Sequence, residues 1–445
     1  MNELKLFKDI EGLIDSSAPS ALLFKKVSID SRSLSRGDIF FGLKGKNFDG
    51  NTFANEALLK GACAVVVDNK DIYNSIVGSK ILVKNSFETL KQFGRKKLES
   101  YKGKIVCVTG SSGKTTTKKL VSLILSTKYQ VFEAYKNFNN EIGVAINAAN
   151  LDMESEFGVF EVGSNNYGEI AQLSRYLKPQ ISVITNIGSS HIGRFGSIEH
   201  IAEEKLSLLN STKSTCYLHE DCKKYVTSCH KDVKKVFFGY SEDSDIVIKN
   251  ISRNEKLYFT VTYCKKTENF QLDHFYDHFV TNASAAIGVA MEQNMNGVDI
   301  QRGLNGFSPE QHRGELLRVG DLSVIDDTYN ASFDSIMSAI NNLKQFKSAE
   351  KYAVLGEMGE IEGFEGELYS KITKTASLLD DITFIFFGEN YKRYNEFSAG
   401  EVFTEESKLK NRLKGIKTGT ILFKASRSKQ FEKYIDFLKG EHLAL

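Results

Sequence analysis

The 445-residue chain lacks several features that would narrow its class at once. It has no tryptophan and three prolines, so Pro-rich linkers are excluded. Its 58 basic and 56 acidic residues give a net charge of +2, which argues against a nucleic-acid binder. No stretch approaches the ~20 apolar residues that span a bilayer, and the first ten residues are unlike a secretory signal. We therefore expect a cytoplasmic protein without nucleic-acid partners or membrane insertion.

The six cysteines are scattered and form no paired CxxC motif. This usage is typical of a reduced compartment, where cysteines act as small core residues. His219, Cys222, Cys229 and His230 lie close in sequence, but their spacing fits no common zinc pattern, and chance explains it better.

Strand-like and helix-like segments are abundant, and from residue 104 onward they alternate. Such alternation favours an α/β fold with a mostly parallel sheet covered by helices. The predicted strands are 38–43, 64–67, 80–83, 104–108, 157–162, 181–185, 245–248, 257–261, 322–326, 351–355, 382–387 and 420–424. The predicted helices are 52–61, 115–127, 168–177, 197–210, 282–292, 332–344, 365–379 and 427–439.

The length predicts about three domains at roughly 150 residues each. We place them at 1–100, 101–312 and 313–445, with the second boundary in the segment from Pro309 to Gly314. Strand–helix alternation restarts after that segment, so the third unit is predicted to be a smaller, Rossmann-like doubly wound domain.

The most informative segment runs from a predicted strand through a glycine loop into a predicted helix. Gly110 and Gly113 allow a tight loop, Lys114 adds a positive charge and Thr115 offers a hydroxyl to a magnesium ion. Such a loop aims backbone N–H groups and the positive end of a helix dipole at one point, which is phosphate-binding chemistry. It is not a full Walker A motif, because Val108 stands where that motif has glycine. An ordinary Gly/Ser turn is the alternative, but the order of strand, glycines, Lys-Thr and helix favours a phosphate loop.

Two further strands of the predicted second domain end in chemically useful side chains. Glu161 closes one strand and His191 follows the next. The carboxyl ends of parallel strands line the ligand crevice, and a carboxylate there is placed to hold magnesium. The alternatives are a solvent-facing glutamate and a structural histidine. Lys205, on a predicted helix, has no local signal beyond that of a solvated lysine.

Three more polar clusters have both a structural and a functional interpretation. An asparagine cluster precedes a helix-like run, and asparagine is common in plain turns. A cluster of acids with Tyr-Asn follows a third-domain strand, where Ser332 or Asn330 also suits a helix N-cap. An Asp-Ser-Arg element lies in the first domain, where arginine suits a phosphate. The clusters are Asn137, Asn139 and Asn140; Asp326, Asp327, Tyr329 and Asn330; and Asp30, Ser31 and Arg32.

These motifs, in this order and over nearly the whole chain, resemble the Mur ligases of peptidoglycan synthesis. The segment Thr109–Thr115 is similar to that family's TGxxGKT loop, which accounts for Val108. Within the family the chain is most similar to the branch that adds a D-alanyl-D-alanine dipeptide, and it lacks the Asp-Asn-Pro-Arg motif of the branch that adds meso-diaminopimelate. The other segments that carry the resemblance are 137–143, 161–164, 168–170, 186–191, 195–197, 327–331 and 424–427.

The resemblance implies an ATP- and magnesium-dependent amide ligase, expected to be a monomer. Its substrates would be ATP, D-Ala-D-Ala and a UDP-N-acetylmuramoyl-tripeptide. The first domain would bind the UDP portion, the second ATP and the third the incoming amine. The substrate contacts implied are Ser31, Arg32, Lys46, Asn47, Asp49, Asn137, Asn139 and Asn140.

The resemblance also assigns the nucleotide and metal sites. The ATP contacts implied are Gly110, Ser111, Ser112, Gly113, Lys114, Thr115, Thr116, Asn282, Arg313, Asp327, Tyr329 and Asn330. The magnesium ligands implied are Thr115, Glu161, His191 and a carbamylated Lys205, and the catalytic set is Lys114, Glu161, His191 and Lys205.

The chain departs from the family pattern at several positions. Ala145 and Phe333 stand where proline is usual, Tyr369 replaces a histidine, Glu357 replaces an aspartate and Ala425 replaces a glycine. Because the substitutions at 333, 369 and 425 lie in the amine-binding domain, a ligase that adds a single amino acid and a folylpolyglutamate-like ligase remain alternatives. The Asp-Ser-Arg element argues against the folate branch, and the intact catalytic set argues against a nucleotide-binding regulator without ligase activity.

Overall fold

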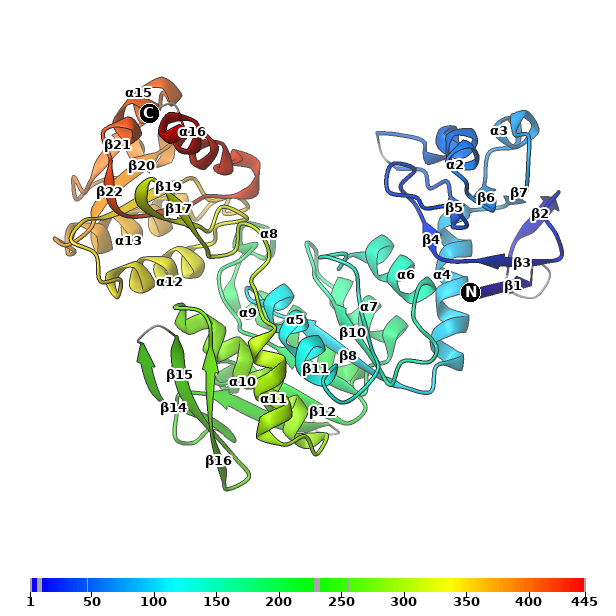
Figure 1. Ribbon diagram of the computed structural model, residues 1–445, viewed down its shortest axis with the longest axis horizontal. Helices are drawn as coiled ribbons and strands as arrows, with labels where there is room; N and C mark the ends of the chain where they lie inside the picture. Colours follow the sequence, from blue (N-terminus) through cyan, green and yellow to red (C-terminus); the bar gives the residue numbers. More distant parts are fainter. Residues whose placement is uncertain (1, 6–9, 46, 228–232, 254–255, 444–445) are drawn as a thin grey trace.

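The computed structural model describes residues 2–5, 10–45, 47–227, 233–253 and 256–443. The chain forms three α/β units in sequence order, and the first and third lie on opposite sides of the second (Figure 1). Among the described residues, no helix has the length and apolar character needed to cross a membrane.

The first unit contains a five-stranded sheet in the order β2-β7-β6-β5-β4, parallel except for β2. A two-stranded sheet, β1 with β3, lies beside it. The strands are β1 Asn2–Lys5, β2 Leu13–Ser16, β3 Ala21–Phe24, β4 Val27–Ser28, β5 Ile39–Phe41, β6 Ala64–Val67 and β7 Lys80–Val83. The helices are the 3-10 turn η1 Gly50–Phe53, α2 Ala54–Leu59, α3 Lys70–Ser75 and α4 Ser86–Ser100.

Helix α4 joins the first unit firmly to the second. Its N-cap is Asn85, and it packs along α6, whose buried alanines belong to the same core cluster as Leu90 and Phe93. The amide of Asn150 pairs with both backbone groups of Val27, accepting from its N–H at 2.8 Å and donating to its carbonyl at 2.9 Å. A shared core and these bonds hold the two units in a fixed relation.

The second unit is built on a nine-stranded sheet in the order β16-β15-β14-β13-β12-β11-β8-β10-β9. It is parallel from β9 to β14 and ends in the antiparallel strands β15 and β16. The strands are β8 Lys104–Thr109, β9 Val131–Glu133, β10 Phe157–Glu161, β11 Ile181–Ile184, β12 Thr215–His219, β13 Lys234–Gly239, β14 Ile246–Arg253, β15 Leu257–Tyr263 and β16 Lys266–Leu272. The helices are α5 Lys114–Leu125, α6 Glu141–Ala149, α7 Glu169–Leu177, α8 Ile192–Phe195, α9 Ile198–Leu206, α10 Asp277–Glu292 and α11 Gly297–Asn305, with 3-10 turns η2 Ser207–Ser211 and η3 Glu220–Tyr225.

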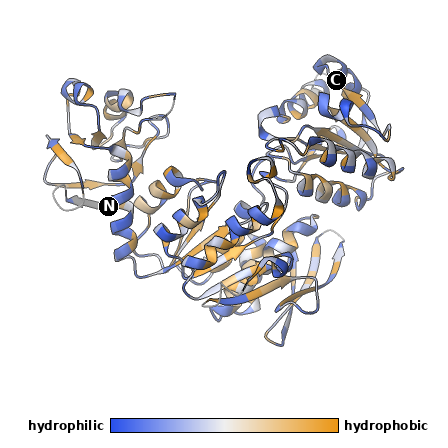
Figure 2. Ribbon diagram, turned by 180° about the vertical axis from the view of Figure 1, so that it is seen from behind, coloured by the Kyte–Doolittle hydropathy of each residue, from blue (hydrophilic) through white to orange (hydrophobic). Residues whose placement is uncertain are grey.

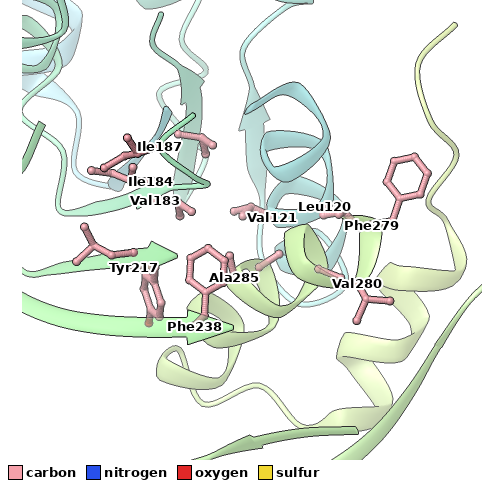
Figure 3. Close-up of a cluster of buried hydrophobic side chains, with 14 of the residues drawn as sticks. Leu120, Val121, Val183, Ile184, Ile187, Tyr217, Phe238, Phe279, Val280 and Ala285 are labelled. Atoms are coloured by element: carbon pink, nitrogen blue, oxygen red, sulfur yellow. The ribbon is translucent and has the colours of Figure 1, made fainter. Parts of the chain in front are cut away.

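Buried apolar runs explain this sheet. All residues of β8 after Lys104 are buried, as expected for a strand covered on both faces. Figure 3 shows Leu120 and Val121 of α5 next to side chains of β11 and α10 in the core between helices and sheet. Figure 2 shows the same strands as hydrophobic ribbons. This packing fixes the start of α5, and hence the phosphate loop before it.

The third unit is a six-stranded sheet in the order β17-β18-β22-β19-β20-β21, parallel except for β17. The strands are β17 Glu315–Val319, β18 Asp321–Asp326, β19 Lys351–Gly356, β20 Thr383–Phe387, β21 Glu401–Phe403 and β22 Thr418–Lys424. The helices are α12 Phe333–Lys344, α13 Glu365–Ser377, α14 Glu389–Arg393, α15 Glu406–Lys414, the 3-10 turn η4 Arg427–Lys429 and α16 Glu432–Leu443.

The predicted elements are observed with shifted ends, while others, such as α3, α11, α15 and β17, have no predicted counterpart. The helix predicted at 282–292 begins at Asp277. The helix predicted at 427–439 begins at Glu432, because Gln430 has a left-handed φ of +48° that separates η4 from α16. The helix predicted at 197–210 ends at Leu206 and continues as the 3-10 turn η2. Of the two N-cap alternatives, Ser332 and Asn330, the structure has Ser332 at the N-cap of α12.

Candidate active site

A cleft of about 550 Å³ lies between the second and third units. Most of the residues implied for ATP and metal binding line it, together with the asparagine cluster. They are Ser111 to Thr116, Asn137, Asn139, Asn140, Glu161, His191, Asn282, Arg313, Asp327, Tyr329 and Asn330.

The phosphate loop is held by its neighbours in a conformation that only glycine suits. Gly113, the N-cap of α5, has a φ of +76°, and a Cβ there would lie 2.5 Å from Asn282 Oδ1. Gly110 has a φ of +148° and packs against Thr185. Ser112 N–H donates to Asn186 Oδ1 at 2.9 Å, so the loop after β11 braces the loop after β8.

Lys114 folds back over this loop. Its Nζ donates to the Gly110 carbonyl at 2.7 Å and the Ser111 carbonyl at 3.3 Å. Burial lowers its pKa; Arg313 lowers it further, while Glu161 opposes the shift. Among the described residues, the hydrogen-bond partners of this cation are backbone carbonyls at the start of a helix, which suits a bound phosphate.

Lys205 is buried on α9 and does not line the cleft directly. Burial, with the positive charge of Lys114, lowers its pKa to about 7, while Glu204 opposes the shift. Among the described residues, its ammonium has no hydrogen bond or ion pair. The sequence did hold a signal for its burial, because Lys205 follows Ile201 by four positions and so shares its apolar helix face.

Glu161 ends β10 and is 2% exposed. Its Oε1 accepts a hydrogen bond from Asn139 Nδ2 at 2.7 Å, and its Oε2 has no partner in the described part of the chain. Thr115 is equally buried on the same cleft wall. A buried carboxylate oxygen without a partner is costly unless a cation or water completes it, so these oxygens fit magnesium.

Over the ranges that the structure describes, no cluster of three His, Cys, Asp or Glu side chains is able to hold a metal ion. A magnesium ion bound through one or two protein oxygens and substrate phosphates needs no such cluster. In the group of His219, Cys222, Cys229 and His230, the last two lie outside the described residues. Cys222 is buried, and His219 Nδ1 lies 3.1 Å from Asp221 Oδ2.

His191 follows β11 and has a left-handed φ of +65°. Its Nδ1 lies 2.5 Å from Oε2 of Glu360, in the third unit. Burial lowers the pKa of His191, Glu360 raises it, and Lys114 and Lys205 lower it further. The histidine is therefore coupled to both lysines and to the third unit.

The third unit adds a polar wall to the cleft. The Arg313 guanidinium lies 3.7 Å from the Tyr329 ring centroid, and Asn137 Nδ2 donates to the Tyr329 hydroxyl. Lys424 donates to Asp327 Oδ2 at 2.7 Å and to the Asn330 carbonyl at 3.0 Å. Burial raises the pKa of Asp327, against the effect of Lys424.

Sequence reasoning missed three residues around this cleft. Asp334 Oδ2 accepts from Ser189 N–H at 2.5 Å and from Ser189 Oγ at 2.7 Å. In the sequence, Lys424 stands out only as part of the 424–427 motif, and no local pattern marks Glu360. Asp334 lies in the first turn of α12, where acidic residues are common because they interact favourably with the helix dipole. The sequence therefore gives no sign of its contact with Ser189, which only the three-dimensional structure shows.

The first-unit residues lie away from this cleft. Arg32 is exposed and pairs with its neighbour Asp30, with NH2 2.8 Å from Oδ2. Ser31 Oγ donates to Glu56 Oε1 at 3.3 Å, and Asp49 is the N-cap of η1. Asn47 is exposed, and Lys46 lies outside the described residues.

The departures from the family pattern are accommodated mainly by packing. Tyr369 is fully buried, and its hydroxyl accepts a hydrogen bond from Met358 N–H at 2.9 Å. Ala425 is also fully buried, facing Gly356. Phe333 begins α12 and is partly buried. None of these three lines the cleft.

Comparisons with known proteins agree with this geometry. Residues 108–290 match the model of the Mur ligase middle domain, and residues 24–103 match that of the Mur ligase family catalytic domain. The UDP-N-acetylmuramoyl-tripeptide–D-alanyl-D-alanine ligase of Bacillus subtilis (strain 168) is 31% identical over 443 residues, covering 96% of this chain and 95% of the relative.

The chain belongs to the Mur ligase family. Two solved Mur ligases share its fold over nearly the whole length. MurF from Acinetobacter baumannii is 26% identical with a TM-score of 0.84 and covers 94% of each chain. MurF ligase from Thermotoga maritima, solved in complex with ADP, is 27% identical with a TM-score of 0.81 and covers 94% of this chain and 98% of its own.

Proposed function

We propose that the protein is the ATP-dependent ligase that joins D-Ala-D-Ala to UDP-N-acetylmuramoyl-tripeptide in peptidoglycan precursor synthesis. The observation that carries the proposal is the cleft, where a phosphate loop faces the third unit together with Glu161, one of whose carboxylate oxygens has no partner in the described part of the chain. The full-length similarity to a relative of that name supports the choice of reaction. We expect a cytoplasmic protein, because ATP and nucleotide-linked precursors are cytoplasmic metabolites, and we expect it to be a monomer.

In this proposal residues 1–100 bind the UDP portion of the substrate, residues 101–312 bind ATP and residues 313–445 bind the incoming amine. The first unit's contacts are Ser31, Arg32, Asn47 and Asp49, together with Lys46. The distance of these residues from the cleft suits a long substrate that places its nucleotide on one unit and its peptide end on another.

The first chemical step is the attack of the tripeptide carboxylate on the γ-phosphorus of ATP, which gives an acyl phosphate and ADP. Lys114, at the start of α5, stabilises the charge on the transferred phosphoryl group. Asn282, against Gly113, lies on the nucleotide side of the loop. Arg313 and Tyr329 close over the nucleotide from the third unit.

Magnesium is the second cofactor of the proposal, held by Thr115, Glu161 and His191. Bound magnesium would screen the negative charge of the triphosphate and of the approaching carboxylate. Glu161 fits this role because one of its oxygens is already held by Asn139 while the other has no partner among the described residues.

Lys205 is proposed to carry a carbamate, formed from its neutral amine and carbon dioxide with loss of one proton. In its unmodified form Lys205 is a buried cation close enough to Lys114 to be repelled by it. A carbamate would replace this repulsion by attraction and could supply an oxygen ligand to a magnesium ion.

In the second step the amine of D-Ala-D-Ala attacks the acyl carbon. The new amide bond forms as the C–O bond to phosphate breaks, and inorganic phosphate and a proton leave. The walls of the cleft come from two units, so their closure excludes the water that would hydrolyse the acyl phosphate.

The test is phosphate release from ATP with the UDP-linked tripeptide and magnesium. D-Ala-D-Ala is compared with single amino acids and with other dipeptides. We expect turnover with D-Ala-D-Ala and none when the amine is omitted. Turnover with a single amino acid but not with the dipeptide would move the protein to another Mur-type activity.

A further inference from the structure

Glu360 reaches from the third unit to the loop that carries His191. It lies in the segment between β19 and α13. Its Oε2 is 2.5 Å from His191 Nδ1, its Oε1 is 2.7 Å from Arg194 NH2, and its carbonyl accepts Gly193 N–H at 3.0 Å. Three consecutive contacts from one residue make this a specific junction rather than a chance encounter.

The backbone on both sides is shaped for this contact. His191 and Glu360 have left-handed φ angles of +65° and +58°. Residues other than glycine rarely adopt this backbone conformation, and they keep it where surrounding contacts enforce it. Gly193 has no room for a side chain, since a Cβ would lie 2.5 Å from Glu362 N.

A carboxylate against Nδ1 determines the form of the imidazole. The contact is a short Nδ1–Oε2 distance whose angles do not meet those of a hydrogen bond, and a small rotation of the imidazole would align it. A carboxylate only accepts hydrogen bonds, so a neutral His191 aligned with it places its proton on Nδ1 and leaves the lone pair on Nε2. This is the arrangement in which histidines bind metal ions, with the second nitrogen held by a carboxylate. The glutamate thus prepares the nitrogen that our proposed site uses.

We propose that Glu360 is a positioning residue that sets the tautomer and orientation of His191 only when the third unit is docked on the second. Docking of the amine-binding unit and readiness of the phosphate-transfer site are thereby linked through one side chain. The catalytic use of the link rests on the proposed function, whereas the link itself is a property of the ligand-free protein.

A second contact holds the same loop independently. Asp334 binds Ser189, two residues before His191, through both its N–H and its hydroxyl. Loss of the Glu360 side chain therefore leaves the two units docked, and its effect is confined to His191 and Arg194. Docking and positioning are separable by mutation.

The first measurement is the ¹⁵N spectrum of histidine side chains in ligand-free protein at pH 8, above the ordinary imidazole pKa of about 6.5. The His191 signal is assigned by its loss in His191→Gln. In the wild type we expect the Nδ1–H tautomer. Glu360→Ala is expected to give a mixture with the Nε2–H tautomer, and Glu360→Gln, whose amide oxygen still accepts, keeps Nδ1–H.

Glu367→Ala is the matched control, because Glu367 is an exposed carboxylate of the same unit whose one ion-pair partner among the described residues is Lys371. If Glu360→Ala does not fold, Glu360→Asp carries the test. Its arm is one methylene shorter and is expected to give the same mixture. An unchanged His191 tautomer in the folded variant, or an equal change in Glu367→Ala, overturns the proposal.

The second measurement is steady-state kinetics. Glu360→Ala is expected to lower kcat roughly 10- to 100-fold, the usual effect of losing a residue that orients a metal ligand, with little change in KM for the UDP-linked tripeptide. Glu360→Gln should recover most of kcat. If the tautomer changes as expected but no variant, nor the wild type, ligates D-Ala-D-Ala, the proposed function fails while the positioning role stands. Wild-type kcat in Glu360→Ala refutes the catalytic use of the link.

Discussion

Replacing His274 with phenylalanine is expected to remove a source of acid sensitivity from the folded protein. The imidazole lies just before α10 in an aromatic cluster, with its ring centroid 4.4 Å from that of Phe279 and 4.8 Å from that of Phe275. Its Nδ1 is buried without a partner among the described residues. Burial lowers the pKa of His274 to about 4, and Asp273 opposes the shift only partly.

The sign of the effect follows from proton binding. Between pH 6.5 and about 4 the imidazole is protonated in the unfolded chain and neutral in the folded one, so the free energy of unfolding falls as pH falls through this window. For a pKa of about 4 against about 6.5 unfolded, the loss between pH 7 and pH 5 is about 2 kcal/mol. Phenylalanine has no proton to bind and avoids this loss. The pKa of His278 is lowered to about 3, so His278 also lowers the free energy of unfolding as pH falls. It does so in the wild type and in His274→Phe alike.

The assay is urea unfolding at pH 7 and pH 5, followed by far-UV circular dichroism because the chain has no tryptophan. At pH 7 the variant should lie within about 1 kcal/mol of the wild type, since the two rings are similar in volume. Between pH 7 and pH 5, the free energy of unfolding of the variant relative to that of the wild type should rise by about 2 kcal/mol. Phe307→Leu changes the same cluster without a titrating group, so its difference from the wild type should not depend on pH. A pH-independent difference for His274→Phe would refute the reasoning.

The remaining predictions concern the cleft. Lys114→Ala should lower kcat by at least roughly 10²-fold, while its melting temperature stays near that of the wild type. Lys104→Ala, at an exposed position, is the control. Near-normal turnover in Lys114→Ala would remove Lys114 from the mechanism. Lys205→Ala should be inactive and partly rescued by acetate or formate, which supply the missing carboxylate, so full activity without rescue would exclude the carbamate. Glu161→Gln should raise the magnesium concentration for half-maximal rate at least roughly tenfold, and an unchanged magnesium dependence would exclude Glu161 as a ligand.

The phosphate loop was predictable because its signals are local. The strand predicted at 104–108 is observed as Lys104–Thr109, and the helix predicted from 115 begins at Lys114. An apolar run, two glycines and an amphipathic helix pattern follow one another within about twenty residues, so short-range rules apply.

The contacts between units were not predictable, because they join residues far apart in the chain. Ser189 and Asp334 are separated by 145 positions, and neither has a sequence neighbour that signals the pairing. Glu360 lies in a loop whose path depends on the buried Tyr369 beneath it. The burial of Lys205 is an intermediate case, since its helix spacing held the signal but its charge argued against a core position.

The division of the cleft between two units also has a consequence for the timing of turnover. In the proposed function, a nucleotide enclosed between the phosphate loop and Arg313 would leave only when the third unit lifts, so each cycle would break and remake the contacts of Tyr329, Asp334 and Glu360. Tighter contacts would protect the acyl phosphate better and delay the departure of ADP by the same measure. Opening would also separate apolar contacts between the two units, such as Phe275 against Phe346, whose ring centroids lie 4.7 Å apart.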